Sequence, residues 1–310
     1  MEITSQHPLV SVAVIAYNSA EYILETLESI KAQTYDNIEL VVSDDCSSDG
    51  TVGICRKWID ANKSRFVDIC IVESPVNTGQ SGNYNRAFDA CAGEWIKEID
   101  GDDRLLPNCI TDFIEYTQGH PEAKYIFGKM SFVGEDSDAF EAVEKWFDYS
   151  FFSMPPNEQL HRLIHERNCI PSPSSFYNRN YVLDLGVRCD ERIQYMEDYP
   201  KWINLLQKGV LFFFLDKKVV EYRVDSGVST HPRPSAEYYK SNLLFDIYYR
   251  WLEWIREDQN EGTKRIVQSQ VDIYRQLLLC EEEISRMKKT KAYRLGKFLL
   301  KPLSLIRHRK

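Results

Sequence analysis

The sequence predicts an α/β fold with a mixed, mainly parallel sheet flanked by helices, and two observations lead to this prediction. Through the first 135 residues, short runs of β-branched and apolar residues alternate with segments whose apolar residues recur at helical spacing. In addition, a chain of 310 residues that is 43% hydrophobic and 27% charged can bury a large core, as one elaborated domain or as two. We therefore expect a globular protein built around this sheet.

The predicted strands and helices follow one another in a regular order. The strands cover residues 9–16, 38–43, 67–73 and 95–99, and the helices cover residues 20–33, a segment around 54–58, and 81–92. In the first helix the apolar residues from Ile23 to Ile30 share one face, and Ser19 is expected to cap the N-terminus. Each of the first three strands forms a βα unit with the helix that follows it, which is the repeat of a parallel sheet.

Polar residues cluster directly after three of these strands. They are residues 16–18, residues 44–45 and residues 100–103, which read Asp-Gly-Asp-Asp. Ligands of open α/β sheets bind beyond the carboxyl ends of the strands, so we expect the three clusters to meet at one edge. Because carboxylates as close as Asp100, Asp102 and Asp103 repel one another unless a cation lies among them, residues 100–103 predict a divalent-metal site. The alternatives are a solvated acidic turn there and a turn with a helix cap at 44–45.

The chain contains neither of the common phosphate-binding loops. The turn at residues 16–20 has no glycine, so the Gly-x-Gly-x-x-Gly pattern is absent, and there is no Gly-Lys-Ser/Thr loop. Acidic residues dominate up to residue 285, where 28 Lys and Arg stand against 47 Asp and Glu. A diphosphate therefore requires a bridging cation, Mg²⁺ or Mn²⁺, and the acidic body excludes a nucleic-acid groove.

Several motifs together resemble family 2 glycosyltransferases of GT-A fold. They are VSVAVIAYN at 10–18, LESIKAQTY at 27–35, VVSDDCSSDGT at 41–51, NTG at 77–79, GEWIK at 93–97, DGDD at 100–103 and YMEDYPKW at 195–202. The resemblance covers about residues 9–228. It implies the GT-A (Rossmann-like) fold, a UDP-sugar donor, and a role in bacterial surface-polysaccharide assembly such as O-antigen, lipopolysaccharide or capsule synthesis.

The resemblance also implies a role for each matching position. The implied nucleotide-sugar-binding residues are Ala16, Tyr17, Asn18, Asp45, Asn77, Gly79, Asp100, Asp102 and Arg223. The carboxylate of Asp45 suits the imide N–H of uracil. In the DxD motif Asp102 is the implied metal ligand, with Asp100 and Asp103 beside it. Near Arg223 the sequence departs from the family pattern, because Asp225 stands where a histidine or another polar residue often follows, so contacts of Arg223 or His231 with the diphosphate or metal stay open.

Glu197 and Asp198 supply the base that sugar transfer needs. An acceptor hydroxyl must lose its proton as it attacks the anomeric carbon, and a nearby carboxylate can take that proton. The resemblance assigns this catalytic role to Asp198, with Glu197 beside it. One base and no covalent nucleophile predict a single displacement that inverts the anomeric centre. The alternative is that the pair only stabilises the start of a helix.

The C-terminal part differs from the rest of the chain. We expect a catalytic domain at 1–230, a helical extension at 231–290 and a basic amphipathic tail at 291–310. Such a tail suits the surface of an anionic inner membrane and a lipid-linked glycan acceptor, with a docked helix or a disordered end as alternatives. The eight separated cysteines, the missing signal peptide and the missing membrane span predict buried thiols and a cytoplasmic protein, peripheral on the inner membrane through this tail.

Two other function classes remain as alternatives. A metal-dependent nucleotidyltransferase also combines a parallel sheet with metal carboxylates, but commonly carries a glycine-rich basic signature near the first strand. A catalytically idle nucleotide-sugar-binding module is expected to have lost Asp102 or Asp198, and both are present. The sequence therefore favours an inverting, metal-dependent hexosyltransferase.

Overall fold

A computed structural model describes residues 7–134, 137–224 and 236–250, together with scattered residues between 261 and 290. The backbone contacts divide the chain into two units, Met1–Asp246 and Ile247–Lys310, which are treated separately. Of the predicted features, His231 and the tail at 291–310 lie outside the described residues. None of the helices that the structure describes combines the length and apolarity needed to cross a bilayer.

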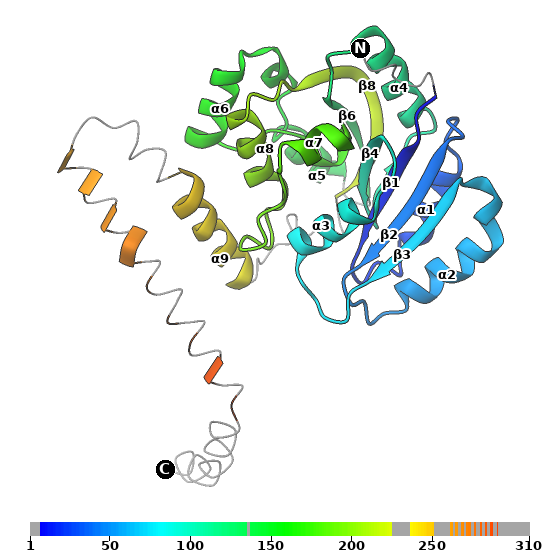
Figure 1. The fold of residues 1–310 in the computed structure, drawn as a ribbon, viewed down its shortest axis with the longest axis horizontal. Coiled ribbons are helices and arrows are strands. Elements are labelled where there is room, and N and C mark those ends of the chain that lie inside the picture. Colours follow the sequence, from blue (N-terminus) through cyan, green and yellow to red (C-terminus); the bar gives the residue numbers. More distant parts are fainter. Residues whose placement is uncertain are drawn as a thin grey trace. The chain divides into compact units, whose positions relative to one another are not determined.

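The first half of the first unit contains the predicted βα units. In order they are β1 (Val10–Ala16), α1 (Ile23–Lys31), β2 (Ile38–Asp44), α2 (Thr51–Asn62), η1 (Lys63–Arg65), β3 (Asp68–Glu73), α3 (Gln80–Ala90) and β4 (Trp95–Asp100). These strands lie in the order β3-β2-β1-β4 and all pair in parallel, with every residue of β1 and β2 buried (Figure 1). The prediction of a parallel sheet is confirmed for this half.

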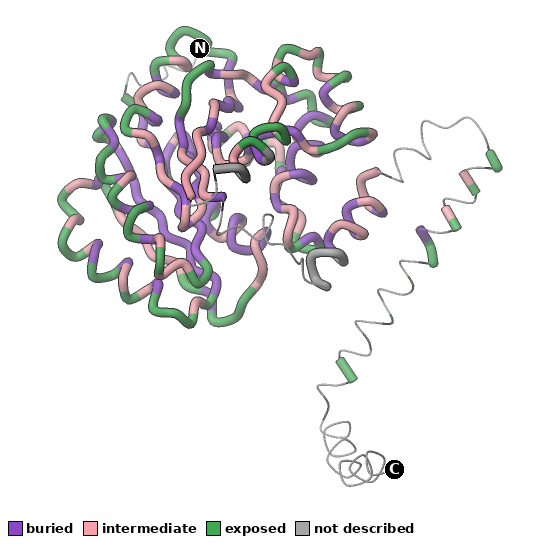
Figure 2. The backbone as a smooth tube through the Cα atoms, turned by 180° about the vertical axis from the view of Figure 1, so that it is seen from behind, coloured by how far each residue is buried: buried purple, intermediate pink, exposed green. Residues whose placement is uncertain are grey.

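Helices cover both faces of these strands. Successive side chains of a strand point to opposite faces of the sheet, so a strand with apolar residues at successive positions needs cover on both sides. The even-numbered residues of β1, from Val10 to Ala16, pack in one core with the apolar faces of α1 and α2. Helix α3 packs on β1, β2 and β3 as well, and its residues lie outside that core. Figure 2 shows the result, with β1, β2 and β4 mostly buried and exposed residues on the outer turns of the helices, whereas β3 at the edge of the sheet is only partly buried.

The second half adds strands in both directions. Its elements are β5 (Arg104–Leu105), α4 (Cys109–Gly119), β6 (Tyr125–Val133), α5 (Ser137–Glu144), η2 (Tyr149–Ser153), α6 (Pro156–His165), η3 (Ser172–Ser174), β7 (Ser175–Asn178), α7 (Arg179–Asp184), α8 (Asp198–Gln207), β8 (Phe213–Arg223) and α9 (Ala236–Phe245), followed by the π turn η5 (Asp246–Arg250). The full sheet has the order β3-β2-β1-β4-β7-β6-β8-β5. Strand β7 is antiparallel to β4 and β6, and β5 is antiparallel to β8, whereas β6 and β8 are parallel.

One glycine explains an irregularity between β6 and β8. The register of this pair shifts on both sides of Lys129. A Cβ atom on Gly128 would lie 2.6 Å from Cγ2 of Val219, closer than side chains approach in folded proteins. The absent side chain therefore lets the two strands stay paired through the shift.

Two local predictions are wrong. Helix α1 begins after Tyr22, and it is the backbone carbonyl of Ser19, not its hydroxyl, that accepts hydrogen bonds from Tyr22 and Ile23, because residues 19–22 form a turn before the helix. The cysteines are all free, as expected, but Cys46 and Cys280 are exposed. Cys46 has a φ of 69° in the loop after β2, where the chain turns at the surface.

Candidate functional site

A pocket of about 570 Å³ opens where β1, β2 and β4 end. It contains nine of the twelve predicted site residues, namely Ala16, Tyr17, Asp45, Asn77, Gly79, Asp100, Asp102, Glu197 and Asp198. The three that do not line it are Asn18, Asp103 and Arg223. The three polar clusters that follow the strands therefore meet at one edge of the sheet, as predicted from the parallel order.

The turn after β1 forms one wall of this pocket. Tyr17 is 51% exposed there, and the carbonyl of Ala16 accepts hydrogen bonds from the Asp45 backbone N–H at 3.0 Å and from Asn83 Nδ2 at 3.1 Å. Asn18 has a φ of 51° and joins the turn to the loop after β2, because its N–H donates to Ser47 Oγ at 2.8 Å. Asn18 thus shapes the wall rather than lining it.

Asp45 holds the neighbouring loop in place. Its buried carboxylate accepts hydrogen bonds from the backbone N–H of Thr78 at 2.9 Å and of Gly79 at 2.8 Å, and it forms an ion pair with Arg86 at 3.1 Å. Gly79 has a φ of 81°, a conformation that favours glycine, and it is the N-cap residue of α3. The uridine contact predicted for Asp45 stays a prediction. Asp45 does not cap the helix α2. The backbone N–H of Thr51, the first residue of α2, donates instead to Asp49 Oδ1 at 3.1 Å.

Asp100, Asp102 and Asp103 form the acidic cluster predicted from the sequence. Their ligand oxygens all lie within 4.8 Å of one another. Burial and repulsion from Asp102 raise the pKa of Asp100 to about 7, although Tyr84 donates a hydrogen bond to its carboxylate at 2.9 Å. Burial, followed by repulsion from Asp102 and Asp100, raises the pKa of Asp103 well above its usual value.

The cluster fits a divalent cation such as Mg²⁺ or Mn²⁺. Three carboxylates supply the oxygen ligands that these ions prefer. One oxygen of Asp103, Oδ2, is buried and has no hydrogen-bond partner among the described residues. A cation would remove the repulsion that raises the pKa of Asp100 and Asp103.

Arg223 supports this cluster from the end of β8. Its backbone N–H donates to Asp103 Oδ1 at 2.8 Å, and its Nε donates to the carbonyl of Asp102 at 3.0 Å. The guanidinium also pairs with Glu25 at 2.8 Å and lies over the ring of Tyr22 at 4.2 Å. With these contacts Arg223 does not line the pocket, and its contact with a diphosphate stays a prediction.

Glu197 and Asp198 lie at the start of α8. Burial raises the pKa of Asp198, and this rise is opposed by a hydrogen bond of 3.0 Å from Asn168 Nδ2 to Asp198 Oδ2. Burial, followed by the charges of Asp198 and Asp100, raises the pKa of Glu197 well above its usual value. Glu197 makes no side-chain cap of the helix. Both carboxylates therefore have a raised pKa and line the pocket, which is typical of groups that exchange protons.

The sequence analysis missed several residues of the pocket. Asn168, Trp146, Phe147 and Tyr222 line it, and Asn168 donates a hydrogen bond to Asp198. Tyr84 lies outside the lining but donates a hydrogen bond to Asp100. Only Tyr222 belongs to a segment that resembles the family, the one that continues with Arg223. A local signal also exists for Tyr84, whose position on α3 follows from the helical pattern, but the other contacts depend on how distant segments pack.

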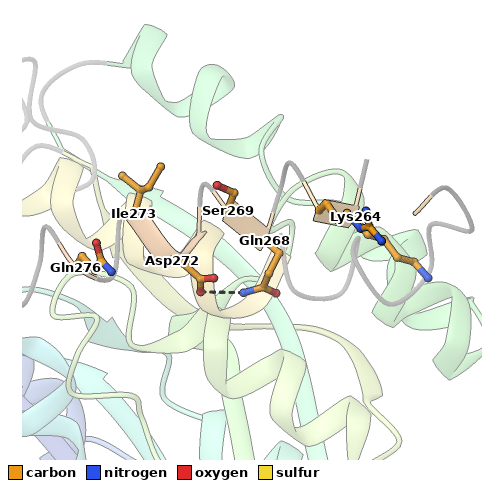
Figure 3. Close-up of a pocket in the computed structure, with 7 residues that line it drawn as sticks. Lys264, Gln268, Ser269, Asp272, Ile273 and Gln276 are labelled. Carbon is orange, nitrogen blue, oxygen red and sulfur yellow. Dashed lines mark hydrogen bonds between the residues drawn. The ribbon is translucent and has the colours of Figure 1, made fainter. Parts of the chain in front are cut away.

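A separate hollow of about 510 Å³ lies in the second unit (Figure 3). It is lined by residues of one stretch, among them Lys264, Ser269 and Ile273, and Gln268 donates a hydrogen bond to Asp272 at 2.9 Å. Its lining holds one carboxylate, and no cluster like that at 100–103. The carboxylate-rich pocket of the first unit is therefore the better candidate site.

Comparison with known proteins agrees with this geometry. The model of the family described as Glycosyl transferase family 2 matches residues 11–185. The chain is 27% identical over 239 residues to the Escherichia coli UDP-Glc:alpha-D-GlcNAc-diphosphoundecaprenol beta-1,3-glucosyltransferase WfaP, covering 77% of this chain and 86% of that one. It is 24% identical over 235 residues to the putative teichuronic acid biosynthesis glycosyltransferase TuaG of Bacillus subtilis, covering 76% and 86%.

Solved structures share the fold. Residues 1–349 of S. aureus TarS in complex with UDP-GlcNAc give a TM-score of 0.62 at 20% identity, covering 85% of this chain and 71% of that one. The longer TarS structure gives a TM-score of 0.57, and this chain spans 42% of its length.

Proposed function

The chain belongs to glycosyl transferase family 2 and has the GT-A fold, and on this premise we propose that it transfers a sugar from a UDP-activated donor to an acceptor hydroxyl, inverting the anomeric centre. The observation that carries the proposal is the shared pocket, in which the carboxylates of Asp100 and Asp102 lie with that of Asp198. Asp100 and Asp102 suit the departure of UDP, and Asp198 suits the activation of the acceptor hydroxyl.

The relatives support a donor and an acceptor class. TarS is known in complex with UDP and with UDP-GlcNAc, which supports a UDP-sugar donor. WfaP is named for a diphosphoundecaprenol-linked acceptor and TuaG for teichuronic acid synthesis. We propose a lipid-linked glycan of a bacterial surface polysaccharide as the acceptor here. The basic tail predicted at 291–310 would suit an acceptor held at a membrane surface.

In this mechanism the two groups of carboxylates act on different parts of the reaction. Asp102, with Asp100 and Asp103, would hold Mg²⁺ or Mn²⁺, which when bound supplies neutralisation of the charge on the departing UDP. Asp198 accepts the proton of the acceptor hydroxyl as that oxygen attacks the anomeric carbon. The C–O bond to the new oxygen forms as the C–O bond to UDP breaks, and the electron pair leaves with UDP. A single displacement of this kind turns an α-linked donor into a β-glycoside.

Metal-dependent UDP binding tests the donor half of the proposal. Calorimetry should detect UDP binding in the presence of Mn²⁺ and a loss of at least about tenfold in affinity after chelation or in Asp102→Asn, because the diphosphate then faces uncompensated carboxylates. Asp216→Asn makes the same change on an exposed residue of β8 and should bind UDP normally. Equal binding with and without the metal would count against the proposal.

Product analysis separates the rival functions. A glycosyltransferase releases UDP from a UDP-sugar, whereas a nucleotidyltransferase releases diphosphate from a nucleoside triphosphate. An idle module binds the donor and releases neither. Detection of diphosphate release would therefore replace the proposed reaction by the first alternative.

The pH dependence of turnover should reveal the bond between Asn168 and Asp198. Asp198 must be ionised to act as a base, so the rate falls as pH drops through its pKa. The bond from Asn168 lowers that pKa, and Asn168→Ala removes it. We therefore expect the acid limb of the kcat/KM profile to move to higher pH.

A second variant at this position guards against a purely structural effect. Asn168 Oδ1 also accepts the backbone N–H of Ile170 at 3.1 Å. Asn168→Asp retains that acceptor but adds a negative charge beside Asp198, and it should move the acid limb further upward. An unchanged limb in both variants would show that Asp198 does not control the profile.

A further inference from the structure

Trp146 is an exposed aromatic residue on the wall of the same pocket. Its side chain is 55% exposed, and it lines the pocket together with Val143 and Phe147. All three come from the end of α5 and the segment after it, a part of the chain that carries no family motif. An apolar surface on the wall of a pocket that also holds polar groups is typical of a ligand-binding site.

The backbone beneath Trp146 is held at several points. Arg167 donates hydrogen bonds to the carbonyl of Trp146 at 2.5 Å and to that of Lys145 at 3.5 Å. Two residues on, Asp148 receives a hydrogen bond of 2.7 Å from Arg162, and its backbone N–H donates to the carbonyl of Cys169 at 3.2 Å. The indole is thus presented by an anchored segment, which lowers the entropy lost when a ligand packs on it.

The residue that binds the Trp146 backbone is adjacent in sequence to the residue that binds Asp198, the proposed base. Arg167 holds the Trp146 segment, and the next residue, Asn168, donates to the carboxylate of Asp198 at 3.0 Å. Two consecutive residues therefore hold the backbone that carries the indole and the carboxylate of the proposed base. The donor side of the pocket, by contrast, comes from the ends of β1, β2 and β4.

We propose that Trp146 is the platform for the acceptor sugar, on which the C–H face of a pyranose ring stacks while a hydroxyl of that ring faces Asp198. Pyranoses have an apolar face and a polar rim, and the pocket offers both kinds of surface on this side, the apolar one from Val143, Trp146 and Phe147 and the polar one from Asn168 and Asp198. This inference rests on the proposed function and adds the place and chemical class of the acceptor.

The test measures the two sides of the pocket separately in the full chain. A panel of methyl pyranosides, the methyl glycosides of glucose, galactose, mannose and N-acetylglucosamine, serves as the acceptor probe in saturation-transfer NMR with enzyme saturated by UDP and Mn²⁺. We expect wild-type protein to bind at least one of them and Trp146→Ala to bind it about tenfold more weakly. Trp146→Phe should recover most of the affinity, and the affinity for UDP should change less than twofold in both variants.

Control variants identify the source of any loss. Leu211→Ala truncates a side chain that is 51% exposed and lies outside the pocket, and it should leave both affinities unchanged. Tyr17→Ala truncates an equally exposed ring on the donor side and should weaken UDP more than the pyranoside.

Each outcome decides between the inferences. Absence of UDP binding in the wild type would overturn the proposed function itself. UDP binding with no pyranoside bound, or a pyranoside bound equally well by Trp146→Ala, would overturn the platform alone. A loss of UDP affinity in Trp146→Ala would instead assign the indole to the nucleotide.

Discussion

Replacing Asp198 with asparagine should reduce turnover by a factor of about 10² to 10⁴ while changing the affinity for UDP less than twofold. The amide has nearly the same shape as the carboxylate but cannot accept the proton of the acceptor hydroxyl. Packing should survive, because the amide oxygen can still accept the hydrogen bond that Asn168 now donates to Asp198. The expected effect is therefore on kcat, measured by release of UDP, and calorimetry checks the affinity.

The same change elsewhere supplies the control. Asp216→Asn removes a carboxylate that is 72% exposed on β8 and should retain the wild-type rate. If Asp198→Asn turns over within a few-fold of the wild type, the base is another group. Glu197 would then be the first to consider, since it lies in the same pocket with a pKa raised well above its usual value.

Replacing Lys201 with methionine should destabilise the protein by about 3–5 kcal/mol, because it leaves a buried carboxylate without its counter-ion. Lys201 on α8 pairs with Glu98 on β4 at 3.1 Å, and both side chains are less than a tenth exposed. Burial alone would lower the pKa of Lys201, but the Glu98 carboxylate outweighs it and keeps the lysine charged. The pair ties the helix that begins at Asp198 to the strand that ends at Asp100.

Urea unfolding followed by circular dichroism measures this effect. Adding Glu98→Gln to Lys201→Met removes the uncompensated charge, and the double variant should recover part of the lost stability. Lys217→Met removes an exposed lysine that pairs with Asp112, and it should change the unfolding midpoint far less than Lys201→Met. A small effect of Lys201→Met would mean that water or another group compensates Glu98.

The first half of the fold follows closely from sequence pattern. Strands β1 and β2 are mostly apolar because helices cover both faces of a parallel strand. Their buried polar residues include Ser11 and Glu39, and the Ser11 hydroxyl donates a hydrogen bond to the Glu39 carboxylate. Strand β4 obeys this rule less well, since it includes Lys97 and Glu98, which are usually surface residues, and both are buried here. Lys97 is accommodated because its ammonium donates to the carbonyls of Glu98 and Pro173, each at 2.6 Å.

The second half could not be predicted in the same way. Strand β7 is only Ser175–Asn178, and its antiparallel place between β4 and β6 depends on partners far away in the chain. Among the site residues, Asp45, Asp100 and Asp102 were predicted to lie at one edge of the sheet, and all three line the pocket there. Asn168 and Trp146 could not be found, because their contribution comes from the packing of the 145–170 segment on the pocket and from no local pattern.

The hydrogen bond from the Arg223 backbone to Asp103 has a consequence for the order in which the chain acquires its structure. The two residues are 120 positions apart, and Arg223 is the last residue of β8. During synthesis, the acidic turn emerges long before the strand that fixes it. The carboxylates proposed to bind the metal can therefore reach their final geometry only after the end of β8 has been synthesised, and this contact closes a long loop of the chain.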